Sequence, residues 1–165
     1  MVWIKQTGRF LLLLLLQVLL INHLQFLGVC HPYIYIFSLL VMPITLPRWA
    51  DMLIGGVAGL ILDMFCNSLG VHIAACIMLM YVRPHLIGAY VSDRERLTDE
   101  IDIRSIGGVV NFVKYTVLLV LLHHTMVFFL TAWSVQHFWF TLLEVVVSSI
   151  ISILLLIGAD LLRNR

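Results

Sequence analysis

The stretch FWFTLLEVVVSSIISILLLIGADLL, residues 138–162, decides the fold of this chain. Only Glu144 and Asp160 carry a charge in it, and leucine, isoleucine and valine supply most of the rest. A helix needs about 20 mostly apolar residues to cross the hydrocarbon of a bilayer. The stretch therefore predicts a membrane-spanning helix.

The whole chain has the composition of that stretch. Of its 165 residues, 62% are hydrophobic and 12% are charged, and the mean hydropathy is +1.06. A soluble domain is roughly 45–50% apolar and about 25% charged. The net charge of +1 gives no basis for nucleic-acid binding. We expect residues 1–165 to form a single integral membrane domain.

Six apolar segments predict six transmembrane helices, at about residues 9–27, 33–46, 49–66, 71–90, 109–133 and 138–162. The second is short and carries Pro43, so we expect a kink or local thinning of the bilayer there. The first resembles a signal peptide, but its apolar run continues without a cleavage site, so we expect it to be retained. Residues 91–108 form the only long hydrophilic loop.

All the basic side chains fall on one side of this arrangement. The ten are Lys5, Arg9, Arg48, Arg83, Arg94, Arg96, Arg104, Lys114, Arg163 and Arg165. The three turns on the opposite side contain none. Because lysine and arginine near helix ends are retained in the cytoplasm, we expect both termini and the loop 91–108 to be cytoplasmic.

A stripe of small residues and one acid marks the third segment. Gly55, Gly59 and Asp63 are four residues apart and share one helix face. The two glycines predict a surface for helix packing or for docking a partner. A carboxylate within the membrane is costly unless it is paired. For Asp63 we weigh an interhelical hydrogen bond or cap against a role in transport, catalysis or partner contact.

The sixth segment carries a matching polar stripe of Thr141, Glu144, Ser148 and Ser152. Its spacing predicts a face turned toward protein, so Glu144, Ser148 and Ser152 are further candidates for packing or docking. Glu144 of this stripe falls in the outer half of the membrane, as do polar residues of the third and fourth segments. Together they predict an outer polar cluster. We take Asp63, Asn67, His72 and Glu144 as its members. Such a cluster lines a cavity or joins the helices of a bundle.

Catalytic and metal sites have weaker support. His72 and Cys76 are four residues apart, and His123 and His124 are adjacent, but no familiar ligand spacing occurs. We therefore expect no metal and no cofactor. Ser148 or Ser152 beside His123 would suit an intramembrane hydrolase, yet no nucleophile motif accompanies them. We expect no catalytic residue and no enzyme.

Two features stay open. Cys30 and Cys66 both fall near the outer face, so a disulfide is geometrically conceivable, although small buried hydrophobic side chains are the ordinary interpretation. Residues 92–104 carry more acidic than basic side chains. This segment is either a docking site for a cytoplasmic partner or a solvated connector.

The order of these motifs resembles a known family. Residues 59–65, Gly-Leu-Ile-Leu-Asp-Met-Phe, are followed by Gly70, His72, Ala74-Ala75 and then Tyr81-Val82-Arg83-Pro84. Together with the turn Pro47-Arg48-Trp49 and the leucine-rich first segment with Gln17, they resemble the rod shape-determining protein MreD along essentially the whole chain. The resemblance marks Gly59, Asp63, Arg83 and Pro84 as family positions.

This resemblance implies a fold, a location and partners. MreD-like proteins belong to the bacterial inner membrane, and their fold is similar to the six-helix substrate-binding subunits of energy-coupling-factor transporters. They work with MreC, the MreB filament, and the RodA glycosyltransferase with its transpeptidase. We therefore expect a non-catalytic scaffold of cell elongation that helps to organise peptidoglycan synthesis. The alternative is a substrate-binding membrane subunit of a small-molecule transporter.

Overall fold

The computed structural model describes residues 2–21, 30–43, 46–90, 106–133 and 137–163, and six helices lie within them. They are α1 (Val2–Leu19), α2 (Ile36–Leu40), α3 (Arg48–Cys66), α4 (Val71–Tyr90), α5 (Val109–Ala132) and α6 (Phe138–Arg163). Helices α3, α4, α5 and α6 are each long and apolar enough to cross a membrane. The chain is therefore an all-helical, multi-pass membrane protein.

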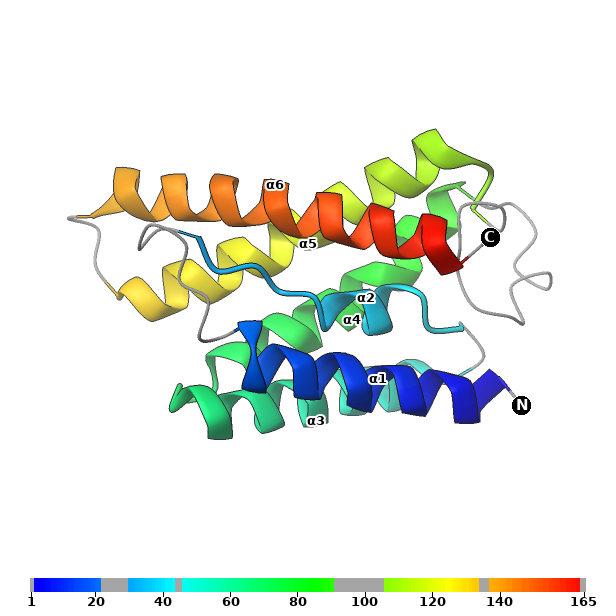
Figure 1. Cartoon of the computed structure of the whole chain (residues 1–165), viewed down its shortest axis with the longest axis horizontal. Coiled ribbons are helices and arrows are strands. Elements are labelled where there is room, and N and C mark those ends of the chain that lie inside the picture. Colours follow the sequence, from blue (N-terminus) through cyan, green and yellow to red (C-terminus); the bar gives the residue numbers. More distant parts are fainter. Residues whose placement is uncertain (1, 22–29, 44–45, 91–105, 134–136, 164–165) are drawn as a thin grey trace.

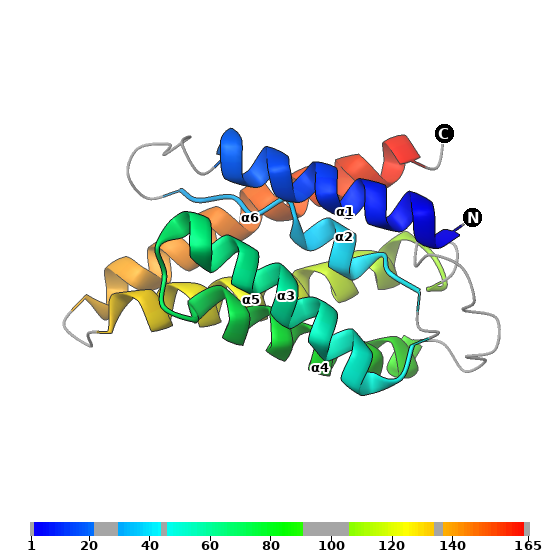
Figure 2. The same ribbon diagram turned by 90° about the horizontal axis from the view of Figure 1, so that it is seen from below.

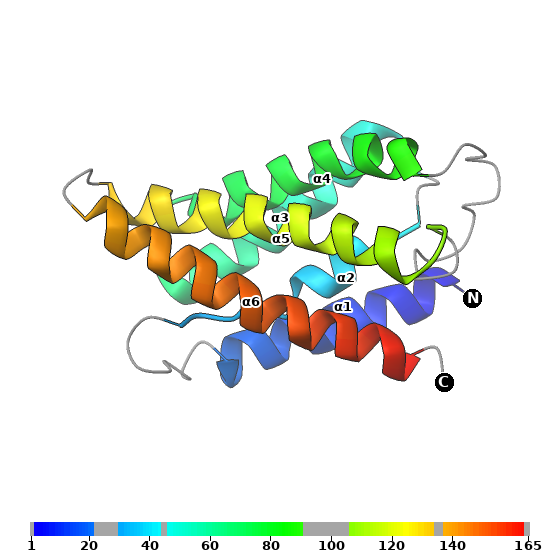
Figure 3. The same cartoon turned by 90° about the horizontal axis from the view of Figure 1, so that it is seen from above.

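The long helices run back and forth along one direction (Figure 1). Both chain termini lie at one end of the bundle, which we call the terminal end; α3 and α5 begin there, and α4 and α6 finish there (Figures 1 and 3). The other end, the far end, holds the α3–α4 turn at residues 67–70. The most extensive helix contact joins α3 to α4, and α5 packs against both α4 and α6. Seen from below, α1 lies beside α2 and α3 (Figure 2).

The second predicted helix, 33–46, is wrong. Residues 31–34 belong to no helix and trace an extended path (Figure 1), α2 has only five residues, and the chain leaves helical geometry again after Val41. The aromatic Tyr33 and the β-branched Ile34 favour extended backbone, and helical geometry begins only at Tyr35. Pro43 disfavours helical geometry in the residue before it and cannot donate a backbone hydrogen bond, so it follows the helix and kinks nothing. We call residues 31–43 the buried segment.

The buried segment nevertheless traverses the bundle from the far end toward the terminal end (Figure 1). An extended residue advances about 3.3 Å, against about 1.5 Å in a helix, so few residues cover this length. Its side chains are almost all buried, and the core around them includes Leu62, Leu79 and Leu119. The segment therefore runs inside protein rather than along lipid.

The other predicted helix bounds agree with the structure to within a residue for α3 to α6. Helix α1 begins earlier than the predicted residue 9 and ends at Leu19, before the predicted residue 27. Residues 22–29 lie outside the described part. So does loop 91–105, which includes the proposed docking segment. The outward faces of α1 and α6 are rich in exposed leucine, including Leu11, Leu15 and Leu154, as a lipid-facing surface requires.

Candidate functional site

The glycine stripe of α3 lies against α4. A Cβ on Gly59 would stand 2.5 Å from the Ile73 nitrogen and closer still to the carbonyl oxygen of His72. A Cβ on Gly55 would stand 2.9 Å from the Cys76 carbonyl oxygen. The stripe is therefore a packing surface within the chain, and it leaves no room there for a partner's helix. Leucine at either glycine would report on folding rather than on docking.

Asp63 closes the α3–α4 hairpin at the far end. Its carboxylate accepts hydrogen bonds from the backbone N–H of His72 at 3.0 Å and of Ile73 at 3.1 Å. It also accepts the Ser68 hydroxyl at 2.5 Å and lies 3.0 Å from His72 Nδ1. The first N–H groups of a helix have no partner within it, so Asp63 caps α4 from the preceding helix. This arrangement is the interhelical bond and cap weighed from the sequence.

The polar stripe of α6 accepts hydrogen bonds from the backbone of the buried segment. Ser148 Oγ accepts the N–H of His31, and Ser152 Oγ accepts the N–H of Tyr33, both at 3.0 Å. From α1, Gln17 accepts the N–H of Ile34 at 2.8 Å and donates to the Pro32 carbonyl at 3.1 Å. Non-helical backbone at membrane depth is tolerated only where protein satisfies it. These side chains provide that satisfaction from both flanks.

The remaining members of the predicted stripe and cluster occupy different positions. Thr141 is buried, Glu144 is half-buried, and Asn67 is exposed at the C-cap of α3 in the left-handed conformation, with φ of 52°. Asparagine is among the few residues that adopt this conformation readily. The structure thus joins Asp63 to His72, whereas Asn67 makes the turn and Glu144 lies on α6.

A buried layer of histidine and tyrosine lies beside this cap. Tyr35 Oη is 2.5 Å from His123 Nε2 and 3.4 Å from Cys76 Sγ. His124 donates through Nδ1 to the Val120 carbonyl at 2.9 Å. The two adjacent histidine rings thus face different partners. Within the described residues, no three metal-ligating side chains converge.

The serine–histidine geometry differs from the predicted pairing. Ser152 Oγ lies 3.2 Å from Nε2 of His124, not of His123. The Ser152 oxygen is fully buried and already accepts the N–H of Tyr33. A nucleophile must reach its substrate, and this hydroxyl instead holds backbone. Cys30, Cys66 and Cys76 are all free, so the conceivable Cys30–Cys66 bridge is not formed.

A second polar centre lies toward the terminal end, around Arg83. This arginine is completely buried, although the sequence placed it with the cytoplasmic basic residues. Its Nε donates to the Leu40 carbonyl at 3.3 Å and to Tyr115 Oη at 3.2 Å. Tyr115 also donates to the Leu40 carbonyl, at 2.7 Å. The two side chains therefore satisfy the carbonyl at the end of α2, which has no helical partner. Pro84, beside Arg83, is buried within α4.

Asp51 is the residue that sequence reasoning missed. It is 1% exposed, its Oδ1 has no hydrogen-bond partner, and the nearby charge of Arg83 acts on it. Both Nη atoms of Arg83 also lack partners. The signal was present in the spacing, because Asp51 lies four residues before Gly55 on the face that continues to Gly59 and Asp63.

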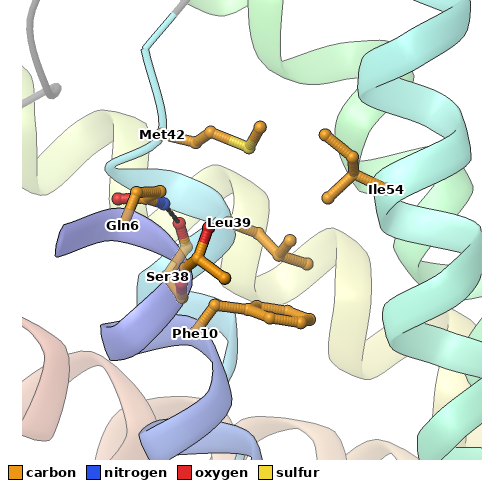
Figure 4. Close-up of a pocket in the computed structure, with 7 residues that line it drawn as sticks. Gln6, Phe10, Ser38, Leu39, Met42 and Ile54 are labelled. Atoms are coloured by element: carbon orange, nitrogen blue, oxygen red, sulfur yellow. Dashed lines mark hydrogen bonds between the residues drawn. The ribbon is translucent and has the colours of Figure 1, made fainter. Parts of the chain in front are cut away.

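Three of the hollows in the described part of the chain accompany these centres. A small apolar one of about 160 Å³ lies between α1, α2 and α3, where Gln6 Nε2 donates to the Ser38 carbonyl at 2.6 Å and Phe10, Met42 and Ile54 face one another (Figure 4). A groove of about 430 Å³ runs over the α3–α4 surface above Gly56. Its lining is Trp49, Met52, Leu53, Gly56, Val57, Leu60, Ile73 and Ile77. The third is a cavity of about 470 Å³ beside His72.

Comparisons with protein-family models, with curated proteins and with solved structures gave no match to this chain.

Proposed function

We propose that the chain is a non-catalytic scaffold of the bacterial cell-elongation complex, an inner-membrane protein with six passes and both termini in the cytoplasm. The resemblance to MreD along the sequence supports the complex. The orientation is supported by the basic side chains, since Lys5, Arg48 and Lys114 belong to helix starts at the terminal end. The buried segment supplies the second pass without a spanning helix.

The proposed partners follow from the same resemblance. They are an MreC-like protein with one membrane helix and a periplasmic domain, the MreB filament, and a RodA-like glycosyltransferase with its transpeptidase. Membrane lipids surround the chain, and no nucleic acid is involved. Since the outer turns are short, the periplasmic mass would come from the MreC-like partner.

The observation that carries the docking step is the groove above Gly56. A small residue lets a second backbone approach closely, and Gly56 is the glycine of α3 that does not face the α4 backbone. Trp49, Leu53 and Leu60 border the groove over about three turns of α3. Its apolar lining suits one apolar membrane helix, and we assign it to the single helix of the MreC-like partner.

The test is copurification of the MreC-like partner with a Gly56→Phe variant. A Cβ on Gly56 would meet only the flexible tip of Ile77, at 3.4 Å, so the variant fills the groove and leaves the α3–α4 contact intact. We expect loss of the partner and rounding of cells that depend on the variant. The matched control is Gly158→Phe on α6, where a Cβ meets nothing within 4 Å. Equal recovery of the partner with both variants would refute docking at the groove.

The cavity beside His72 favours a second function, the substrate-binding membrane subunit of a small-molecule transporter. It lies at the far end and is lined by both polar and apolar groups, as ligand sites are. This function predicts that depletion of the protein reduces uptake of one small molecule without altering cell shape. Rounding of the cells with unchanged uptake would reject it.

A further inference from the structure

The far-end cavity is built from side chains of four regions of the chain. Its described lining is Gln17, Val18, Ile21, His31, Pro32, Tyr33, Phe65, Cys66, Ser68, His72, Val127 and Thr131. At about 470 Å³ it falls in the size range of small-molecule sites, roughly 300–1,000 Å³. The Gln17 amide is engaged by the buried segment and the Ser68 hydroxyl by Asp63. Hydrogen-bonding groups that could contact a ligand must therefore come from other residues of the lining.

His72 supplies one hydrogen-bond acceptor. Its Nδ1 lies 3.0 Å from the carboxylate of Asp63, which accepts from every other neighbour it contacts. A carboxylate that only accepts requires Nδ1 to carry the hydrogen, which leaves a lone pair on Nε2 of the neutral ring. That Nε2 has no partner, although His72 is only 4% exposed. A buried polar atom without a partner requires an explanation, and a ligand's donor would supply one here.

Thr131 supplies a second acceptor. Its hydroxyl donates to the Val127 carbonyl at 2.7 Å, so the lone pairs of its oxygen remain to accept. Tyr33 and Phe65 contribute aromatic rings to the same lining. Aromatic faces attract cations, most strongly where water is excluded. Acceptors and rings together suit a molecule that donates hydrogen bonds and carries positive charge.

The charged residues around the cavity also favour a cationic ligand. The sequence has no lysine or arginine at positions 10–47, 49–82 or 115–162, which include all the lining residues. Asp63 lies behind His72, and Glu144 acts electrostatically on Tyr33. An anion would therefore meet no opposite fixed charge here, whereas the carboxylates of Asp63 and Glu144, which do not line the cavity, favour a cation through their electric field.

We propose that this cavity binds a small protonated amine with an apolar or aromatic body, whose ammonium group donates to His72 Nε2 and Thr131 Oγ1. Uptake of the amine after binding rests on the second proposed function, that of a transporter subunit, whereas binding does not. The site itself requires the cavity and these acceptors. Binding and uptake are therefore measured separately.

The experiment uses three probes that share a benzene ring and differ in charge. Phenethylamine is a cation at pH 7, 2-phenylethanol is neutral and phenylacetate is an anion. Each is titrated calorimetrically into the full chain in detergent, with empty micelles as the blank. We expect phenethylamine to bind about tenfold or more tightly than 2-phenylethanol, because a charge-assisted bond is roughly twice as strong as a neutral one. We expect no binding of phenylacetate.

Matched variants locate the site. His72→Asn keeps a donor for Asp63 at the δ position and removes the acceptor at ε, so we expect it to weaken phenethylamine binding about tenfold. His85→Asn is its control, because His85 is exposed on the same helix and outside the cavity. Thr131→Val should weaken binding severalfold, while Thr125→Val, outside the lining, should not. Circular dichroism verifies that each variant folds.

Each result decides a different point. Tighter binding of phenylacetate or 2-phenylethanol than of phenethylamine would overturn the amine class. Binding that is unchanged in both His72→Asn and Thr131→Val, or the absence of binding by all three probes, would overturn the site. Phenethylamine binding without uptake into cells would support the site and reject the transporter function alone.

Discussion

Two carboxylates lie on one face of α3, near its opposite ends, and they are satisfied very differently. Asp63, at the far end, accepts two backbone N–H groups, a hydroxyl and an imidazole. Asp51, at the terminal end, is more deeply buried, and one of its oxygens has no partner. Between them, Gly55 and Gly59 hold α3 against α4.

This difference shows that different interactions stabilise the two ends of the α3–α4 hairpin. The Asp63 charge is met by hydrogen bonds at 2.5–3.1 Å, which define the geometry of the turn. At Asp51, Oδ1 has no hydrogen bond, and the opposite charge that acts on the carboxylate is that of Arg83, whose own Nη atoms lack partners. Burying a charge is costly unless it is paired and hydrogen-bonded. The far end is therefore held by directional hydrogen bonds, whereas Asp51 at the terminal end depends on the electrostatic influence of Arg83.

The largest loss of stability should come from forcing apart α3 and α4, the two helices of this hairpin. Gly59→Ala forces a Cβ into the α4 backbone, which cannot yield as a side-chain tip can, so we expect a loss of about 3 kcal/mol in unfolding free energy. Denaturant unfolding in detergent micelles, followed by circular dichroism, measures it. Gly56→Ala should change stability by no more than about 1 kcal/mol, in the favourable direction. Similar losses in both variants would contradict the close packing at Gly59.

Removing the far-end carboxylate should have the next largest effect. Asp63→Ala leaves buried donors unsatisfied, so we expect a loss of about 2–3 kcal/mol, and Asp63→Asn should lose less because one acceptor oxygen remains. The same unfolding measurement applies. Asn67→Gly is the control in the same turn, since glycine adopts the left-handed conformation freely. A loss for Asp63→Ala no larger than for the control would show that the cap contributes little.

The terminal-end carboxylate is tested by a double-mutant cycle. Asp51→Asn should leave the Arg83 charge uncompensated, and Arg83→Gln should do the same to Asp51. The double variant should therefore be more stable than the sum of the two losses predicts. We expect a coupling of about 1–2 kcal/mol in unfolding free energy. Strictly additive losses would mean that the two charges do not compensate each other.

The smallest effect should follow the loss of one of two donors to the Leu40 carbonyl. Tyr115→Phe removes the 2.7 Å bond but leaves the donor of Arg83, so we expect a loss of about 1 kcal/mol. Tyr81→Phe is the control, because Tyr81 is exposed. An equal loss in the two variants would show that the Tyr115 hydroxyl does not support the end of α2.

Part of the site was readable from spacing, and part was not. The four-residue period from Gly55 to Asp63 predicted a shared face, and the serine spacing predicted that Ser148 and Ser152 face protein. Neither pattern names the partner, because a period identifies a face of a helix and not what lies opposite it. The surface expected to dock a partner at Gly55 and Gly59 is instead covered by α4.

The burial of Arg83 could not be read from the sequence either. An arginine seven residues before the end of a predicted span looks like one more cytoplasmic charge. Only the fold brings the Leu40 carbonyl, Tyr115 and Asp51 around it. These residues come from α2, α5 and α3, so no local pattern on α4 reports their presence.

The sequence by itself determined that this is a multi-pass membrane protein, where four of its long helices begin and end, and which face of α3 is small. Hydropathy and helical period are local properties, and the bilayer acts on each span separately. Only the tertiary structure decided that residues 31–43 do not form a spanning helix. Their backbone is stable at membrane depth because distant side chains bond to it, as Ser148 does to His31 across 117 positions of sequence. The backbone held in this way places His31, Pro32 and Tyr33 in the lining of the far-end cavity.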